Sequence, residues 1–139
     1  MAKVKEVKDL KVMVVDDISS FRDIITKILT ELGIILIVEA STGLEAWEKI
    51  ALESKGVEKF DLVISDINMP KMSGMDLLKN IREFNRTAKL PFILVSTESE
   101  QHIILQALQL EISDYLLKPY DRELAIKKLK KVLTKIIYA

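Results

Sequence analysis

The segment DLVISDINMPK, residues 61–71, decides the fold. Residues 62–64 form a short, continuous apolar run, and such runs are typical of strands buried on both faces of a parallel sheet. The run leads into a carboxylate, Asp66, and Pro70 follows four residues later. The segment therefore predicts a central strand that delivers a charged side chain to the edge of a sheet, after which the INMP stretch turns the chain away.

The rest of the chain repeats this alternation of short apolar runs with helical patterns. Four further apolar runs occur at residues 12–15, 34–38, 92–95 and 115–117. Apolar residues recur at helical spacing over residues 19–32, 43–54, 74–84, 99–110 and 121–137. Five strands alternating with five helices predict a doubly wound α/β fold, with helices on both faces of a parallel sheet. Helix-end signals agree: Ser20 with Asp23 resembles a capping box, Gly33 suits the end of the first helix, and Asp121 is a candidate N-cap.

Composition limits the possible classes of protein. The chain has 139 residues, of which 49% are hydrophobic, enough for one domain with a real core. Its 21 basic and 21 acidic residues balance, which gives no support for binding to nucleic acid or to an anionic membrane. It has no cysteine, which excludes disulfides and thiolate metal sites.

The first residues lack the apolar centre of a secretory signal, and no run is long enough to span a membrane, so we expect a cytoplasmic location. No repeat or linker is apparent. We therefore expect residues 1–10 to be a short N-terminal extension and residues 11–139 to be one domain, with no second, output domain.

Polar side chains follow four of the five predicted strands. They are Asp16 and Asp17 after the first, Asp66 after the third, Ser96 and Thr97 after the fourth, and Lys118 before Pro119 after the fifth. Taken singly, each is ordinary, since an Asp pair often caps a helix and Lys-Pro often makes a turn. The carboxyl ends of parallel strands share one edge of the sheet, however, so we expect these side chains to converge there.

Three clustered carboxylates repel one another, and one pair about 4 Å apart costs on the order of 1–4 kcal/mol at effective dielectric constants of 80 to 20. A hard divalent cation removes this repulsion, and oxygen ligands without His or Cys favour Mg²⁺ or Mn²⁺. Lys118 adds a second positive charge. The guest that suits such a site is a phosphoryl group, either bound there or attached covalently to one aspartate.

Four motifs together resemble the response-regulator receiver domain. They are VVDD (14–17), SDINMPKMSG (65–74), VSTE (95–98) and YLLKP (115–119), in the order and spacing of that family. The resemblance runs from about Lys11 to the last helix and is strongest with the single-domain chemotaxis regulators of the CheY type. It implies a flavodoxin-like, CheY-like (βα)5 fold whose five-stranded sheet has the order 2-1-3-4-5, an order that comes from the resemblance alone.

The resemblance also implies a role for each site residue. Asp66 would be the phosphoacceptor, taking a phosphoryl group from the phosphohistidine of a histidine kinase. Asp17, Asp66 and the backbone carbonyl of Asn68 would bind Mg²⁺ directly, and Asp16 would hold it mainly through water. Lys118 would pair with the phosphoryl oxygens, and the Lys118–Pro119 bond would be cis.

A second group of residues would carry the signal or set its lifetime. Ser96 would swing its hydroxyl onto the phosphoryl group, and Tyr115 would follow by burying its ring. Asn68 and Glu98 occupy positions that tune the lifetime of the acyl phosphate, and both match the chemotaxis type. Thr97 stands where a small residue is frequent, so its bulk would restrict the approach of a donor.

The resemblance places the output surface on the helix 99–110, the strand 115–117 and the helix 121–137. The helix 99–110 has more apolar residues than one buried stripe needs, so some of them must face outward. Glu111 stands where glycine commonly ends this helix, so we expect a different helix end. The lysines of the last helix fit either a solvated face or a contact with an acidic partner.

The favoured function is a phosphorylation-dependent binding switch, a monomer that meets a flagellar motor switch protein or a phosphatase in chemotaxis. Two alternatives of the same class are a stand-alone phosphorelay intermediate and a receiver cut from a larger regulator. The alternative of another class is a Mg²⁺-dependent aspartyl phosphatase. Such enzymes usually place a second acid two residues after the nucleophile, where this chain has Asn68. We therefore expect a phosphoacceptor that assists its own phosphorylation and dephosphorylation, and not an enzyme.

Overall fold

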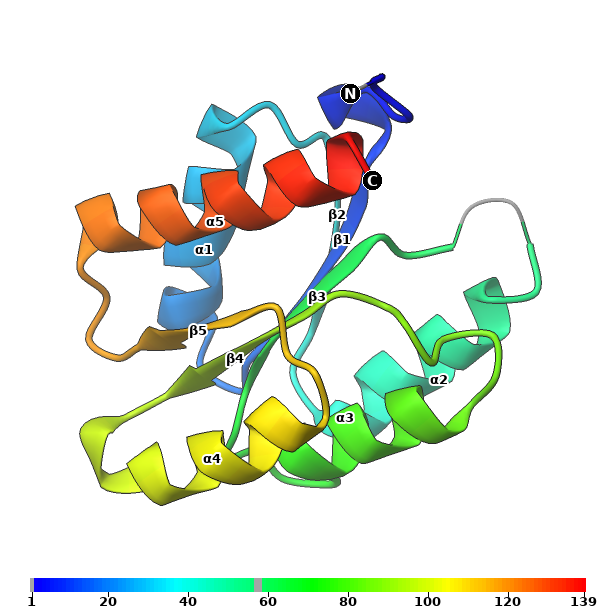
Figure 1. Cartoon of the computed structure of the whole chain (residues 1–139). Coiled ribbons are helices and arrows are strands. Elements are labelled where there is room, and N and C mark those ends of the chain that lie inside the picture. Colours follow the sequence, from blue (N-terminus) through cyan, green and yellow to red (C-terminus); the bar gives the residue numbers. More distant parts are fainter. Residues whose placement is uncertain (1, 57–58) are drawn as a thin grey trace.

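A single parallel sheet of five strands forms the centre of the molecule (Figure 1). The computed structural model describes residues 2–56 and 59–139. The strands are β1 (Lys11–Val15), β2 (Leu36–Ala40), β3 (Leu62–Asp66), β4 (Phe92–Ser96) and β5 (Asp114–Leu117). Their order is β2-β1-β3-β4-β5, and every neighbouring pair is parallel. The predicted doubly wound fold and strand order are confirmed.

Helices cover both faces of this sheet. They are α1 (Ser19–Glu31), α2 (Gly43–Glu53), α3 (Gly74–Glu83), α4 (Gln101–Gln109) and α5 (Arg122–Ile137), with short 3₁₀ turns η1 (Val7–Asp9) and η2 (Glu98–Glu100). Figure 1 shows α1 and α5 on one face and α2, α3 and α4 on the other. Two separate apolar layers result, one between the sheet and α1 with α5, the other between the sheet and the remaining three helices.

The central strands are buried as the apolar runs predict. All residues of β3 and β4 are buried, and this includes the charged end of β3. Burial of strands on both faces is the usual consequence of right-handed crossovers that place helices on either side. The sheet therefore holds its carboxyl edge rigidly, and that edge carries the candidate site.

The second strand differs from its prediction. It begins at Leu36 and not at Ile34, because the chain first closes α1: Gly33 adopts a left-handed φ of 98°, and the Ile34 amide donates to the Leu29 carbonyl at 3.0 Å. Gly33 thus ends the helix as predicted. Burial on both faces is wrong for this strand, since β2 is an edge strand and Leu36 is 46% exposed.

The two other helix-end predictions have opposite outcomes. Asp121 caps α5 as predicted, accepting a hydrogen bond from the Leu124 amide at 3.1 Å. The capping box of Ser20 with Asp23 is wrong, because α1 already begins at Ser19 and its N-cap is Ile18. Ser20 therefore lies inside the first turn, where its hydroxyl cannot cap the helix.

The predicted helix 99–110 is two elements, η2 followed by α4. It ends before Glu111, which has a left-handed φ of 58° that glycine would adopt more easily. Arg82 at the end of α3 fixes this turn, donating to the carbonyls of Leu110 at 2.7 Å and Glu111 at 3.3 Å. Glu111 thus keeps the left-handed conformation that glycine usually supplies here, and the expectation of a different helix end is not borne out.

The first residues pack against the domain. The Val4 amide donates to the Ile137 carbonyl at 2.7 Å, and Lys5 forms an ion pair with Asp61 at 2.7 Å. Leu10 is fully buried. Within the described residues, no helix has both the length and the apolar character needed to cross a membrane.

Candidate functional site

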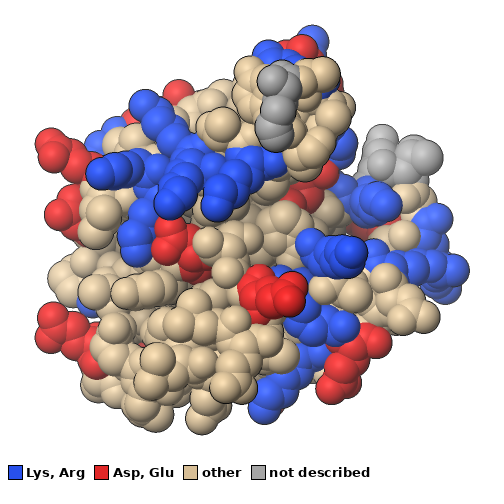
Figure 2. Space-filling model, viewed as in Figure 1, with Lys and Arg blue, Asp and Glu red and all other residues tan. Residues whose placement is uncertain are grey.

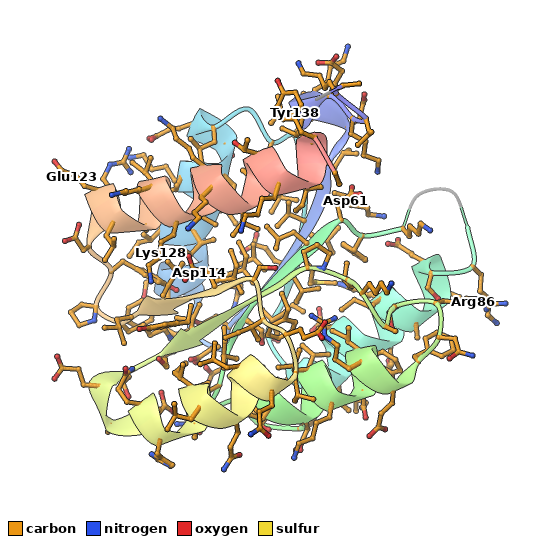
Figure 3. All side chains as sticks on the ribbon, viewed as in Figure 1. Asp61, Arg86, Asp114, Glu123, Lys128 and Tyr138 are labelled. Atoms are coloured by element: carbon orange, nitrogen blue, oxygen red, sulfur yellow. The ribbon has the colours of Figure 1, made fainter. Side chains whose placement is uncertain are left out.

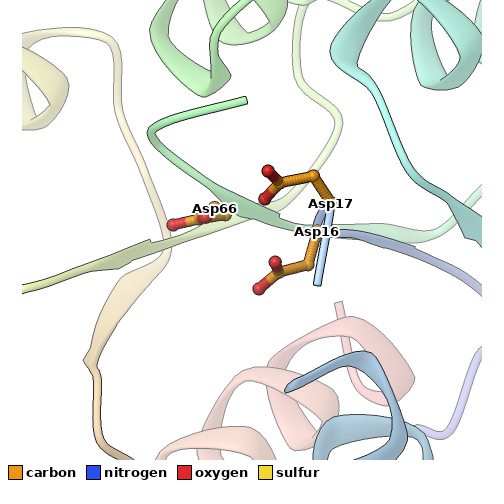
Figure 4. Close-up of side chains that lie close together, drawn as sticks. All are labelled: Asp16, Asp17 and Asp66. Carbon is orange, nitrogen blue, oxygen red and sulfur yellow. The ribbon is translucent and has the colours of Figure 1, made fainter. Parts of the chain in front are cut away.

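Three carboxylates meet at the carboxyl edge of the sheet. Asp66 is the last residue of β3, while Asp16 and Asp17 follow directly after β1, the neighbouring strand. One oxygen of each lies within 4.8 Å of the others (Figure 4). Asp16 and Asp66 are buried, at 3% and 7% exposed, whereas Asp17 is exposed. The predicted convergence of these side chains is confirmed.

Lys118 brings an ammonium group to this cluster, on a side chain that is 8% exposed. It follows β5, and its Nζ lies 2.7 Å from Asp16 Oδ2 and 3.2 Å from Asp66 Oδ2. The Phe21 ring of α1 lies beneath it, with its centroid 4.0 Å from Nζ. The Lys118–Pro119 bond is cis, as the resemblance implied. The lysine therefore contacts the carboxylate at the end of β3 and the one that follows β1.

The site has more negative than positive charge, so binding of a further cation is favoured. The pKa of Asp66 is raised from 3.8 to about 6, because burial, with a smaller contribution from the nearby Asp16, raises it by more than the attraction of Lys118 lowers it. Lys118 therefore does not fully offset the cost of an ionised Asp66. With Asp17 included, three carboxylates face one ammonium, and the donors are all oxygens. This set suits a hard divalent cation of the Mg²⁺ or Mn²⁺ kind.

The loop after β3 folds back tightly beside Asp66. The Gly74 amide, at the start of α3, donates to the Ile67 carbonyl at 2.8 Å. A Cβ at residue 74 would collide with the Asp66 carbonyl oxygen, so only glycine permits this return. Asn68 lies in the loop with its side chain exposed. Its backbone carbonyl as a metal ligand stays a prediction.

Ser96 and Thr97 leave β4 in different directions. Ser96 is fully buried, and its Oγ accepts a hydrogen bond of 3.5 Å from Gln101 Nε2 at the start of α4. The Thr97 hydroxyl lies 2.8 Å from Ser99 Oγ and donates to Glu100 Oε1 at 3.1 Å. Both hydroxyls are therefore engaged by residues at or near the start of α4.

Glu100 is the residue of this region that the sequence prediction missed. It is 6% exposed, and its carboxylate accepts hydrogen bonds from Thr97 and from the Asn68 side-chain amide. A signal was available, because TESE (97–100) has the spacing of a capping box, and the structure forms one. Glu98, which the resemblance singled out, is exposed.

Tyr115 is held by α5. Lys128 donates to the Tyr115 carbonyl at 2.7 Å, and its Nζ lies 4.2 Å from the ring centroid. The same lysine pairs with Asp114 at 3.4 Å (Figure 3). A cleft of about 650 Å³ lies between residues 97–99 and the β5–α5 segment, and Tyr115 and Lys118 line it. The ring is half-buried, so its predicted inward movement stays a prediction.

Comparison with known proteins shows the family of the chain. Residues 12–130 match the family model described as the response regulator receiver domain. The chain therefore belongs to the response regulator receiver domain family.

Among its curated relatives are chemotaxis proteins of two bacteria. CheY1 of Helicobacter pylori strain J99 is 39% identical over 124 residues, which cover 89% of this chain and 97% of that protein. CheY-3 of Vibrio cholerae serotype O1 is 36% identical over 129 residues, which cover 93% of this chain and 95% of that protein. The solved structure of the V. cholerae chemotaxis response regulator CheY4 has a TM-score of 0.75 and 30% identity, covering 88% of this chain and 98% of that one.

Proposed function

We propose that this protein is a CheY-type response regulator that accepts a phosphoryl group on Asp66 from a histidine kinase. The observation that carries the proposal is the buried Asp66 carboxylate, which lies 3.2 Å from the Lys118 ammonium and beside two further aspartates. An ion pair that only stabilised the fold would need one carboxylate beside Lys118, whereas this edge of the sheet has three. Membership of the receiver family supports the same function.

In the proposed reaction, an Asp66 carboxylate oxygen attacks the phosphorus of a phosphohistidine. A P–O bond forms, the P–N bond breaks, and the imidazole leaves with the electron pair of that bond. Lys118 would pair with the phosphoryl oxygens, and its ammonium already lies beside Asp16 and Asp66, which supports this role. The protein's contribution is positioning and charge neutralisation.

A divalent cation would be held by Asp17, Asp66 and the backbone carbonyl of Asn68, with Asp16 acting through water. When bound, Mg²⁺ supplies charge neutralisation between the carboxylates and the incoming phosphoryl oxygens. The all-oxygen donor set and the raised pKa of Asp66 support this assignment. Hydrolysis of the acyl phosphate ends the signal, and Asn68, Thr97 and Glu98 would set how quickly that occurs.

The proposed output is a change of the α4-β5-α5 face, transmitted by Ser96 and Tyr115. Leu105 and Leu108 of α4 are 69% and 53% exposed, so an apolar surface is present without any movement. Figure 2 shows it as an uncharged area over α4, below a group of basic side chains over α5. Exposed apolar residues next to charge are typical of a protein contact site.

The partner we propose is a flagellar motor switch protein, or a phosphatase, in chemotaxis. The identity with the chemotaxis proteins CheY1 and CheY-3 supports this role. We further propose that residues 11–139 act as one receiver unit, as a monomer in the cytoplasm, without binding nucleic acid or membrane. The balanced net charge supports the last point.

Intact mass spectrometry tests the proposal. The wild-type protein and the Asp66→Asn variant are incubated with acetyl phosphate or phosphoramidate, with Mg²⁺ and with EDTA. We expect a labile gain of one phosphoryl group in the wild type with Mg²⁺ only. A stable gain in Asp66→Asn, or continuous turnover of the donor with no phosphoprotein, would contradict the proposal and favour the phosphatase alternative.

A further inference from the structure

Glu100 is a buried carboxylate without a cation. Its side chain is 6% exposed, and no lysine, arginine or histidine forms an ion pair with it in the part of the chain that the structure describes. A buried charge is costly unless hydrogen bonds compensate it. The hydrogen-bond donors around Glu100 must therefore compensate for its burial. Their positions show which segments of the chain Glu100 connects.

Those donors come from two loops that border Asp66. Glu100 Oε1 accepts from the Thr97 amide at 2.8 Å and from its hydroxyl at 3.1 Å. Glu100 Oε2 accepts from Asn68 Nδ2, and Asn68 lies two residues after Asp66. One carboxylate thus ties the β3–α3 loop to the β4–α4 loop.

Glu100 is also the N-cap residue of α4. The next residue, Gln101, donates to the Ser96 hydroxyl at 3.5 Å. The first turn of α4 is therefore joined to the phosphoacceptor loop through Asn68 and to the end of β4 through Ser96 and Thr97. A movement of the Ser96 hydroxyl toward Asp66 would break the Gln101 contact at the first turn of α4, the turn that begins next to Glu100.

We propose that Glu100 is a positioning residue that latches α4 in its unphosphorylated place by holding Asn68. The inference rests on the proposed phosphoacceptor function. It adds that the hydrogen bond between Asn68 and Glu100 must break when a phosphoryl group occupies the site. It assigns the latch to Glu100 and not to Glu98, which is exposed and whose carboxylate has no partner among the described residues. In a two-state switch, loss of a contact made only in one state shifts the population toward the other.

The test measures affinity for Mg²⁺ with beryllofluoride, a phosphoryl analogue that binds without chemistry. Glu100→Ala and Glu100→Gln should both bind beryllofluoride more tightly than the wild type, by about fivefold. This is the lower end of the change in affinity that coupled sites in proteins usually show. Glutamine has the size of glutamate, so the packing around residue 100 is kept. Its NH₂ group cannot accept a hydrogen bond, so one of the contacts with Asn68 and Thr97 is lost. Glu48→Gln is the matched control, because Glu48 is an exposed carboxylate of α2 without a partner among the described residues.

Three results would overturn the latch. The first is an affinity of both Glu100 variants within twofold of the wild type. The second is an equal effect of Glu98→Gln, and the third is full additivity of Asn68→Ala with Glu100→Ala, since a latch between the two predicts that the second change adds little. If the wild type itself does not bind beryllofluoride, the proposed function fails and the latch fails with it.

The wild-type protein offers a measurement that needs no substitution. The Thr97 amide and the Asn68 side-chain amide donate to the same carboxylate, that of Glu100, and both give signals in ¹⁵N NMR spectra. Both signals should shift together when Mg²⁺ and beryllofluoride are added. Unchanged signals in a protein that binds the analogue would show that Glu100 keeps its contacts and does not act as a latch.

Discussion

Asp66→Asn should make the protein more stable in the absence of Mg²⁺. The folded protein raises the pKa of this carboxyl from 3.8 to about 6, chiefly by burial, so the ionised form is disfavoured in the folded state. A rise of about two pH units corresponds to about 3 kcal/mol of lost stability, at about 1.4 kcal/mol per unit. The side chain is 7% exposed, so solvent screening does not reduce this figure much.

The sign follows from proton binding. Because the folded state holds the proton more tightly than the unfolded state, wild-type stability falls as the pH rises from about 4 to about 6, and the full cost is present above that range. Asparagine carries no charge at any pH. At pH 7.5 in EDTA, Asp66→Asn should therefore exceed the wild type by about 3 kcal/mol, or roughly 10 °C in melting temperature.

Urea unfolding at pH 7.5 and pH 4.5 measures this difference, with Asp23→Asn as a control because Asp23 is exposed. The advantage of Asp66→Asn should shrink toward zero at the lower pH. Mg²⁺ at one hundred times its dissociation constant should add about 2.7 kcal/mol to the wild type and less to the variant. Equal stabilities at pH 7.5, or an advantage independent of pH, would refute the argument that the site stores the cost of a buried charge.

Three further predictions concern single side chains. Lys118→Met should lose about 3 kcal/mol of stability at pH 7.5 and less at pH 5, because it leaves Asp16 and Asp66 without their cation; an equal loss at both pH values in urea unfolding would contradict this. Thr97→Ala should be phosphorylated faster by small donors, and equal rates of phosphoryl gain by mass spectrometry would contradict the steric argument. Glu111→Gly should gain about 1 kcal/mol, since its φ of 58° suits glycine; a lower melting temperature would refute it.

Short apolar runs in the sequence predicted the central strands well, because a strand that is buried on both faces must consist of apolar residues. The apolar run before Asp66 corresponds to β3, and the run at 92–95 corresponds to β4. The strand after Gly33 was misplaced because its first apolar residues complete the helix end before the strand begins. Periodicity alone does not distinguish an apolar residue that closes a helix from one that opens a strand.

The meeting of the aspartates with Lys118 was predictable from the sequence, whereas the contacts of Glu100 were not. A parallel sheet puts Asp16, Asp66 and Lys118 at one edge, and the strand order that the resemblance implied puts β1 beside β3, so these side chains meet. The pairing of Glu100 with Asn68 depends on how two loops of different strands approach each other, which no local pattern encodes. The TESE capping box predicts the Thr97 contact alone.

The central claim is that Asp66 forms the acyl phosphate, and locating the modified residue tests it most directly. The protein is incubated with Mg²⁺ and phosphoramidate and then reduced with borohydride, which converts an aspartyl phosphate to homoserine. Peptide mass spectrometry then identifies the position. The account predicts homoserine at residue 66 and nowhere else. Homoserine at Asp16 or Asp17, or none in a protein that has gained a phosphoryl group, would contradict it.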